Sequence, residues 1–189
     1  VLERQATVTE GAVDHAEERG TVEFRDVSFR YPGSSENELE HISFKVGKGR
    51  TLAIIGATGS GKTTLVSLIP RFYDATGGQV LVDGVDVKDY TFDALYDRLG
   101  YVTQKAVLFS GTIRDNVFFG ESAVPDTQDG LDRAIALSQA GEFVDKLPEG
   151  TEHRIAQMGR NVSGGQKQRL SIARALAREP EILIFDDSF

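Results

Sequence analysis

Apolar and polar residues nearly alternate in two stretches near the start of the chain. The first stretch runs from Val22 to Tyr31 and the second from Ile42 to Val46, with a Pro-Gly-Ser-Ser turn between them. An alternation with a period of two residues is typical of strands that bury one face. The sequence therefore predicts two antiparallel, half-buried strands.

A different pattern starts at Thr51, where the residues up to Ile55 are almost continuously apolar. Such a run is typical of a strand that is buried on both faces. A glycine-rich loop follows, and residues Lys62 to Ile69 carry apolar side chains at helical spacing. The order strand, glycine loop, helix is therefore predicted for residues 51–69.

Short strands and helices follow one another along the rest of the chain. We expect strands at residues 79–82, 99–102 and 181–185, and helices at residues 92–98, 112–119, 126–139, 141–146 and 163–178. Most of residues 105–162 would then form a helical subdomain beside the sheet. This mixture of elements indicates the α/β class.

Composition and charge exclude several functions. The 189 residues carry 21 basic and 29 acidic side chains, and the net charge of -8 disfavours nucleic acid as a partner. The chain has no cysteine, which excludes disulfides and a thiolate zinc site. His15, His41 and His153 are too scattered to form a pair of metal ligands at helical spacing. No apolar run reaches the roughly 20 residues that span a bilayer, so we expect a soluble chain. Residues 1–20 are acidic and without aromatic side chains, which is typical of a solvated arm or linker.

The segment from Gly56 to Thr63 matches the phosphate-loop pattern G-x-x-x-x-G-K-[ST] completely. In this pattern backbone N–H groups wrap the phosphates, Lys62 supplies a positive charge, and the Thr63 hydroxyl is placed to coordinate magnesium. The alternative is a glycine-rich turn before a core helix, which a buried lysine without an anion would make costly. We expect the nucleotide contacts to come from Gly56, Thr58, Gly59, Ser60, Gly61, Lys62, Thr63 and Thr64.

Two aspartates, Asp186 and Asp187, follow the apolar run of residues 182–185. A phosphate-loop protein needs a second residue for its magnesium site, usually an acid at the end of a neighbouring buried strand. Asp186 fits that role, and Asp187 is positioned to polarise an attacking water. A strand that simply ends in a polar turn would give the same local pattern.

A second possible anion site lies at Ser163, Gly164, Gly165 and Gln166, where a helix is predicted to begin. A serine and two glycines there leave a hydroxyl and backbone N–H groups aimed outward. One nucleotide does not need two such sites. Two chains arranged head to tail could place one on each side of a shared nucleotide, although the same residues also describe an ordinary capped helix.

Together these motifs resemble the nucleotide-binding domain of an ABC transporter, over residues 21–185. Residues 56–63 match the Walker A motif, residues 182–186 match Walker B, and residues 161–166 resemble the signature motif. The resemblance implies a P-loop NTPase core, in which helices flank a mixed sheet, with an antiparallel β subdomain and a helical subdomain. It also implies that Tyr31 stacks on adenine and that Gln104 touches magnesium and faces the membrane domain.

Residues 108–116 resemble the exporter branch of this family, in which each domain is fused behind membrane helices. The resemblance therefore implies ATP and Mg²⁺ as cofactors, and a second nucleotide-binding domain and a transmembrane domain as partners. It places the chain on the cytoplasmic face of the cell membrane. Residues 1–20 would be the linker from the transmembrane domain, and residues 21–189 the nucleotide-binding domain.

Two departures from the family pattern bear on catalysis. The family usually has glutamate where this chain has Asp187, and the shorter side chain reaches about 1.5 Å less. The chain also ends at Phe189, before the D-loop and the switch histidine of the family, so we expect a C-terminal truncation. With Lys62, Gln104 and Asp187 as catalytic residues, ATP hydrolysis is expected to be slow.

The predicted function is that of an ATP-binding and ATP-hydrolysing domain which dimerises head to tail over ATP and drives export across a membrane. One alternative is a nucleotide-holding, weakly catalytic module that supports the active site of a partner. Another is a soluble ABC ATPase without a role in transport, which the net charge of -8 and the exporter-like segment disfavour. A small-molecule kinase would have no use for residues 163–166.

Overall fold

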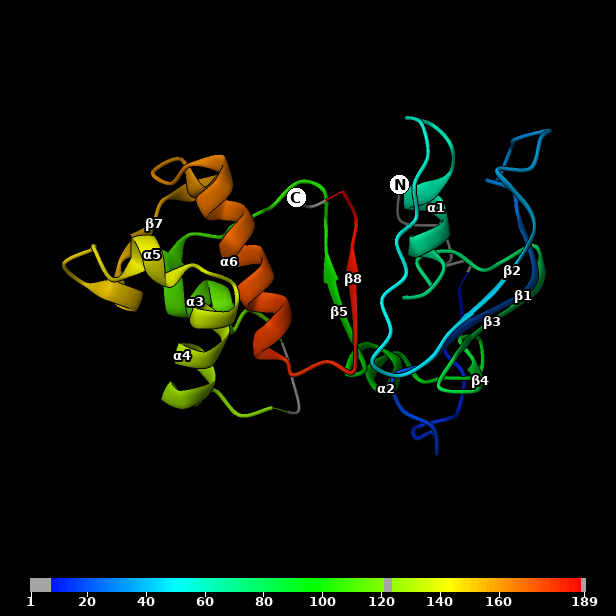
Figure 1. Ribbon diagram of the computed structural model, residues 1–189, viewed down its shortest axis with the longest axis horizontal. Helices are drawn as coiled ribbons and strands as arrows, with labels where there is room; N and C mark the ends of the chain where they lie inside the picture. The colour runs from blue at the N-terminus through cyan, green and yellow to red at the C-terminus, as the bar shows by residue number, and fades with distance from the viewer. Residues whose placement is uncertain (1–7, 121–123, 188–189) are drawn as a thin grey trace. The chain divides into compact units, whose positions relative to one another are not determined.

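The computed structural model describes residues 8–120 and 124–187, which form two compact units. The first unit comprises Val1–Leu99 and the second Gly100–Phe189. Figure 1 shows the helices and strands of both units. Each unit buries its own set of apolar side chains.

An antiparallel sheet with the strand order β2-β1-β3-β4 forms the centre of the first unit. Its strands are β1 (Val22–Phe29), β2 (Leu39–Val46), β3 (Gly77–Val82) and β4 (Val85–Asp86). In β1 the side chains of Val22, Phe24, Val27 and Phe29 are buried and those between them are more exposed, so the alternation holds on each side of a register shift between Phe24 and Val27. The two predicted antiparallel strands are confirmed, and the strand predicted at residues 79–82 is confirmed as β3.

Two helices, α1 (Lys62–Ser67) and α2 (Phe92–Tyr96), complete the first unit and confirm the helices predicted there. The Thr91 hydroxyl caps α2 by accepting a hydrogen bond from Ala94 N. A buried ion pair joins segments that are distant in sequence: Arg98 donates to Asp83 at 2.8 Å, and Thr21 N donates to the same carboxylate at 2.8 Å. This pair fixes the start of β1 and the end of α2 to the β3–β4 turn.

Residues 10–13 of the N-terminal arm are hydrogen-bonded to the segment before α2. Gly11 N donates to Tyr90 O at 2.9 Å, and Thr91 N donates to Val13 O at 2.8 Å. A Cβ atom on Gly11 would lie 2.2 Å from Asp89 O, so this close approach requires glycine. The sequence pattern predicted a solvated arm: no described residue of the arm is buried, but the main chain of this part is hydrogen-bonded to the unit, which the pattern did not predict. Residues 1–7 lie outside the described residues.

The strand predicted at residues 51–55 is wrong. These residues have no regular structure, and Leu52, Ile54 and Ile55 are exposed, Ile55 by 94%. A strand buried on both faces needs a hydrogen-bonded neighbour, and the sheet of the first unit contains no strand beside this segment among the described residues. The apolar run predicted the tendency to be buried but not the partner that would bury it.

The second unit contains two pairs of strands. β5 (Leu99–Val102) pairs with β8 (Ile182–Phe185), and β6 (Gly111–Thr112) pairs with β7 (Arg154–Ile155). The predicted strands at residues 99–102 and 181–185 are confirmed by the first pair. The second pair was not predicted, because two-residue strands are too short to show a period.

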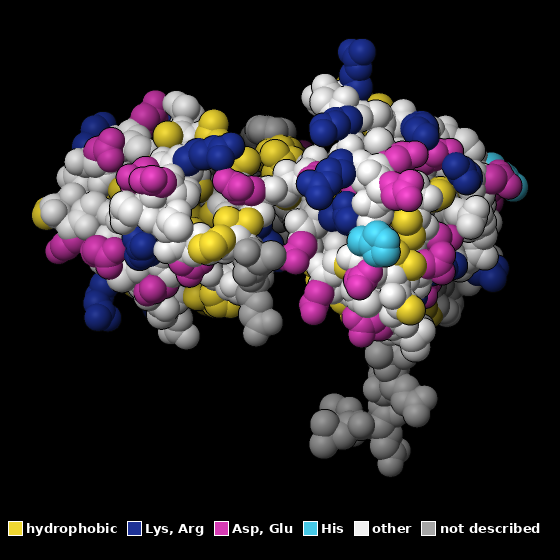
Figure 2. Space-filling model, turned by 90° about the horizontal axis from the view of Figure 1, so that it is seen from below, with side chains coloured by type: hydrophobic (Ala, Val, Ile, Leu, Met, Phe, Trp, Pro, Cys, Tyr) yellow, Lys and Arg dark blue, Asp and Glu magenta, His cyan; other side chains and the backbone are white. Residues whose placement is uncertain are grey.

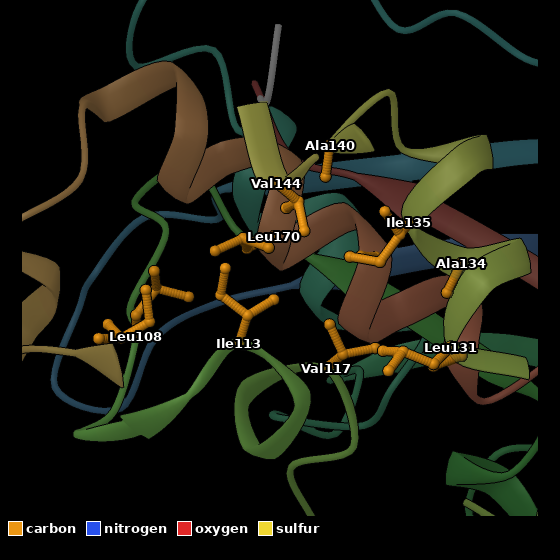
Figure 3. Packing of buried hydrophobic residues seen from close by; sticks show 12 residues of the cluster. Leu108, Ile113, Val117, Leu131, Ala134, Ile135, Ala140, Val144 and Leu170 are labelled. Carbon is orange, nitrogen blue, oxygen red and sulfur yellow. The ribbon is translucent and has the colours of Figure 1, made fainter. Parts of the chain in front are cut away.

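The helices of the second unit are α3 (Ile113–Val117), α4 (Gln128–Leu137), α5 (Gly141–Val144) and α6 (Gly164–Ala177), with short 3-10 turns at Gly150–Glu152 and Gln157–Gly159. All four predicted helices are confirmed, in shorter form. They pack around a cluster in which Ile113, Leu131 and Leu170 are fully buried (Figure 3). α6 is part of this cluster, so the helical layer extends beyond the predicted subdomain at residues 105–162.

Acidic and basic side chains are interspersed on the face of each unit that Figure 2 shows. Among the described residues, no helix is long and apolar enough to cross a membrane.

Candidate functional site

The phosphate loop of the first unit leads directly into α1. Gly61 precedes the helix with a left-handed backbone (φ 81°), and Gly59 has a φ of 80°, conformations that favour glycine. A Cβ atom on Gly56 would lie 2.5 Å from Ser60 Oγ, so a side chain there would make the Ser60 hydroxyl move. The shape of the loop itself therefore favours glycine most clearly at Gly59 and Gly61.

Lys62 closes the loop by donating from Nζ to Gly56 O and to Ala57 O, each at 2.8 Å. These carbonyls hold the ammonium group over the loop, where a phosphate could take over the same donors. The Thr63 side chain is exposed and Thr64 is buried. The two threonines thus face different surroundings, and only Thr63 fits a role as a magnesium ligand.

Tyr31 lies close to this helix in the first unit. Its hydroxyl and the Thr64 hydroxyl are 2.8 Å apart and share a hydrogen bond. The ring makes edge contacts with Phe29 and Tyr73, at centroid distances of 4.8 and 5.3 Å. The structure therefore places Tyr31 beside the phosphate-loop helix, and its predicted stacking on adenine stays a prediction.

Asp186 lies at the end of β8 in the second unit and is only 8% exposed. Its backbone N donates to Val102 O at 3.0 Å, and its carboxylate accepts a hydrogen bond from the Tyr101 hydroxyl at 3.3 Å. Burial, together with the neighbouring Asp186 carboxylate, raises the pKa of Tyr101 well above its usual value, so the phenol remains a donor. The strand pair β5–β8 thus fixes both the main chain and the side chain of Asp186.

Gln104 and Asp187 meet beside this pair. Gln104 Nε2 donates to Asp187 Oδ2 at 2.9 Å, although the residues are 83 positions apart. Asp187 has a left-handed backbone with a φ of 49°, which aspartate adopts more readily than most residues. Three predicted site residues, Gln104, Asp186 and Asp187, are thus brought together in the second unit, while Tyr31 and the phosphate loop are together in the first.

The predicted second anion site begins α6. Ser163 and Gln166 form a capping box: Ser163 Oγ accepts from Gln166 N at 3.3 Å, and Gln166 Oε1 accepts from Ser163 N at 2.8 Å. Gly164 and Gly165 are exposed, and a Cβ atom on either would meet nothing within 4 Å. The capped helix is therefore present, and its role toward a nucleotide stays a prediction.

The sequence analysis missed an aromatic platform in the second unit, made of Phe109 and Phe119 with Arg174 beneath them. The two rings stack at a centroid distance of 4.0 Å, and the Arg174 guanidinium lies 5.4 Å from each ring centre. Arg174 also donates to Asn116 O, Asn116 Oδ1 and Val107 O. Both rings remain more than 40% exposed, so this network supports an apolar surface in contact with solvent.

The side-chain oxygen atoms of the predicted site residues are of the kind that magnesium accepts when it is bound together with a nucleotide. Among the described residues, no cluster of three or more histidine, cysteine, aspartate or glutamate side chains could hold a metal ion alone. Mg²⁺ usually takes one or two carboxylates and completes its shell with waters and phosphate oxygens. The Thr63 hydroxyl of the first unit is an oxygen ligand of that kind, and so, separately, are the Asp186 carboxylate and the Gln104 amide oxygen of the second unit.

Comparison with known proteins identifies the class to which these motifs belong. The family described as ABC transporter matches residues 39–189, which include the phosphate loop, the capped helix and Asp186. The chain belongs to this family, and the predicted P-loop NTPase fold is confirmed.

The relatives include a flippase and a solved exporter. It is 44% identical to an ATP-dependent lipid A-core flippase of Aromatoleum aromaticum over 192 residues, which cover 99% of this chain and 31% of the relative. It is 46% identical to the uncharacterised ABC transporter ATP-binding protein YfiB of Bacillus subtilis over 169 residues, covering 89% of this chain and 29% of the relative. A solved bacterial Atm1-family ABC exporter with ATP bound matches with a TM-score of 0.85 and 34% identity, over 100% of this chain and 32% of that one. The chain thus spans about a third of the length of the proteins it matches.

Proposed function

We propose that the chain binds ATP with Mg²⁺ and hydrolyses it slowly to drive export across a membrane. The observation that carries this proposal is the complete phosphate loop, in which Lys62 already holds its ammonium group over the loop carbonyls at 2.8 Å. Membership of the family implies that the chain binds ATP, and the exporters among the relatives favour transport as the process that ATP hydrolysis would drive. In the first unit Lys62 and Thr63 would hold the phosphates and the metal; in the second unit Gln104 and Asp186 are the proposed metal ligands, and Asp187 would polarise the attacking water.

The test is calorimetric titration of the protein with Mg–ATP, comparing wild type with Lys62→Ala. Loss of the ammonium group should weaken binding by several fold or more, because a charge-assisted contact to phosphate is worth about 1.5–3 kcal/mol. Lys48→Ala removes an exposed lysine upstream of the loop and serves as the matched control. Unchanged affinity in Lys62→Ala would overturn the assignment of the phosphate loop.

A second chain of the same kind is the proposed partner. Ser163, Gly164 and Gly165 are exposed at the start of α6, and the backbone N–H groups of the two glycines lie in its first turn, where a helix can bind an anion. In a head-to-tail dimer these residues would contact the ATP held by the partner's phosphate loop. Each chain would then contribute to both nucleotide sites.

The proposed membrane partner is a transmembrane domain that docks on the platform of Phe109 and Phe119. Exposed aromatic rings backed by an arginine favour an amphipathic helical segment as the occupant. The relatives are about three times as long as this chain, which leaves room for such a domain. Residues 1–20 would then be the linker to it, and the chain would work at the cytoplasmic face of the membrane.

A second candidate function is a nucleotide-holding module that supports the catalytic site of its partner. The contact between Gln104 and Asp187 favours it, because the short carboxylate already accepts a hydrogen bond from the Gln104 amide nitrogen at 2.9 Å. An engaged, shorter carboxylate is a poor base for water. Site-resolved ATP turnover distinguishes the candidates, because the module would show binding with almost no turnover at its own site.

A further inference from the structure

The start of β2 lies against the phosphate loop of the first unit. A Cβ atom on Gly61 would lie 3.0 Å from Leu39 Cδ2, 3.3 Å from Glu38 O and 3.5 Å from Glu38 Oε1. Leu39 is buried, and Glu38 N donates to Phe29 O, at the end of β1, at 2.8 Å. The Glu38 carboxylate therefore lies beside the last glycine of the phosphate loop, on a main chain that is tied to β1.

The Glu38 side chain is exposed and makes no hydrogen bond or ion pair within residues 8–120 and 124–187, the part of the chain that the structure describes. Lys62, the basic side chain of the loop, donates to two loop carbonyls at 2.8 Å instead. The next carboxylate on β2, that of Glu40, accepts a hydrogen bond from Asn37 Nδ2 at 3.2 Å. Unlike Glu40, Glu38 therefore has both carboxylate oxygens available to a ligand.

A carboxylate in this position can serve only some parts of a nucleotide. It has no donor, and it repels phosphate, because like charges a few ångströms apart destabilise each other. The donors of ATP are the ribose hydroxyls and the adenine amino group, and only the ribose is attached directly to the phosphates. In dinucleotide-binding proteins an acidic side chain accepts a hydrogen bond from a ribose hydroxyl in the same way.

Glu38 also lies between the two groups that are expected to hold the ends of the nucleotide. On one side its carboxylate adjoins Gly61 of the phosphate loop. On the other side its main chain is bonded to Phe29, whose ring contacts Tyr31 at a centroid distance of 4.8 Å. With the phosphates on the loop and the base on Tyr31, the ribose would pass Glu38.

We propose that Glu38 recognises the sugar of the bound nucleotide, its carboxylate accepting a hydrogen bond from a ribose hydroxyl. This inference rests on the proposed function, because it assumes that the phosphates of ATP lie on the phosphate loop. It adds a preference for a nucleotide with a complete ribose over its deoxy analogues. The phosphate loop alone provides no such preference, because its contacts are to phosphates.

The test is calorimetric titration of wild type, Glu38→Ala, Glu38→Gln and the control Glu40→Gln with the Mg²⁺ complexes of ATP, 2′-deoxy-ATP, 3′-deoxy-ATP and pyrophosphate. The measured quantity is the ratio of the affinity for ATP to that for each deoxy analogue within one variant. Because all three nucleotides carry the same triphosphate, this ratio cancels any effect of the removed charge on phosphate binding.

We expect wild type to prefer ATP over one of the two deoxy analogues by about fivefold to tenfold, the value of one exposed hydrogen bond to a charged group. Glu38→Ala should bind ATP and both analogues about equally, and should bind pyrophosphate at least as tightly as wild type does. Glu38→Gln should keep part of the preference, because an amide oxygen is a weaker acceptor than a carboxylate. Glu40→Gln should keep all of it.

Three results would overturn the proposal while leaving the phosphate loop in place. Equal binding of ATP and both analogues by wild type would show that no ribose hydroxyl is recognised. A preference that persists in Glu38→Ala would assign the sugar contact to another residue, and one that is lost equally in Glu40→Gln would make it a general effect of charge. If wild type does not bind Mg–ATP, or if Lys62→Ala binds it as well as wild type, the proposed function itself fails and this inference fails with it.

Discussion

Substitutions of Tyr31 can separate two contributions that this side chain is expected to make to nucleotide binding. Its hydroxyl shares a hydrogen bond of 2.8 Å with the buried Thr64 on α1, and its ring is predicted to stack on adenine. Tyr31→Phe removes the first contribution, and Tyr31→Ala removes both. Because Thr64 lies in the helix that follows the phosphate loop, the hydroxyl contact should affect the binding of phosphates, whereas the ring should affect only the base.

The expected magnitudes follow from the nature of each contact. A neutral hydrogen bond contributes about 0.5–1.5 kcal/mol net, so Tyr31→Phe should weaken binding by about fivefold. Stacking of a base on an aromatic ring is worth roughly 1–3 kcal/mol, so Tyr31→Ala should cost a further tenfold or so for ATP. The edge contacts with Phe29 and Tyr73 hold the ring in place and are lost only in the alanine variant.

Calorimetry with Mg–ATP, Mg–ADP and Mg–pyrophosphate measures both effects. We expect Tyr31→Phe to weaken all three ligands equally, and Tyr31→Ala to weaken the two nucleotides more than pyrophosphate. Tyr73→Phe, which removes the hydroxyl of a neighbouring, 40% exposed tyrosine, is the control. An equal effect of Tyr31→Ala on nucleotides and pyrophosphate would refute the contact with the base, and normal binding in Tyr31→Phe would refute the role of Thr64.

Two further predictions concern turnover. Asp187→Glu adds about 1.5 Å of reach and should raise ATP hydrolysis at this site by about tenfold or more, measured as phosphate release. Asp187→Asn should change the already low rate of hydrolysis only a little. A large loss of hydrolysis in Asp187→Asn would show that aspartate is a competent base. Gly164→Asp should abolish most ATPase activity of the assembled transporter, because it places a carboxylate against the partner's phosphates, whereas the neutral control Gly164→Asn should retain more. The space around Gly164 accommodates either side chain, so equal losses in both variants, with normal folding, would contradict the dimer geometry.

Local patterns in the sequence were sufficient for most elements of both units. Strand β1 follows a period of two residues on each side of its register shift, and α6 begins at a serine with glutamine three positions later, so each could be recognised from adjacent residues. The segment at residues 51–55 shows where such reasoning ends. Its apolar run is a local property, but a strand exists only where a second strand supplies hydrogen bonds, and the choice of that neighbour is made by distant parts of the chain.

The residues of the candidate site also fall into two groups, those that a local pattern predicts and those that depend on distant parts of the chain. The phosphate loop is contiguous in sequence, and the spacing of its glycines is sufficient to predict that it binds phosphate. The contact between Gln104 and Asp187 spans 83 positions, and the one between Tyr101 and Asp186 spans 85. The sequence suggested Asp187 only from its place after Asp186, and Gln104 only through a family resemblance. It gave no reason to single out Tyr101, because a tyrosine in a short strand is usually a packing residue.

The sequence predicted helix α6 but not the role of its Arg174, which supports the aromatic platform. In α6 the side chain of Arg174 occupies a position where helical periodicity predicts either a solvent-facing charge or a salt bridge. Instead its guanidinium donates to main-chain and side-chain oxygens of Asn116 and Val107 and lies under two phenylalanine rings. Satisfying the charge in this way allows α6 to hold Phe109 and Phe119 at the surface, where apolar rings would otherwise tend to fold inward. Helix α6 therefore carries the proposed dimer contact at its first turn and supports the proposed membrane-domain contact nearer its end, so a movement of this one rigid helix would affect both.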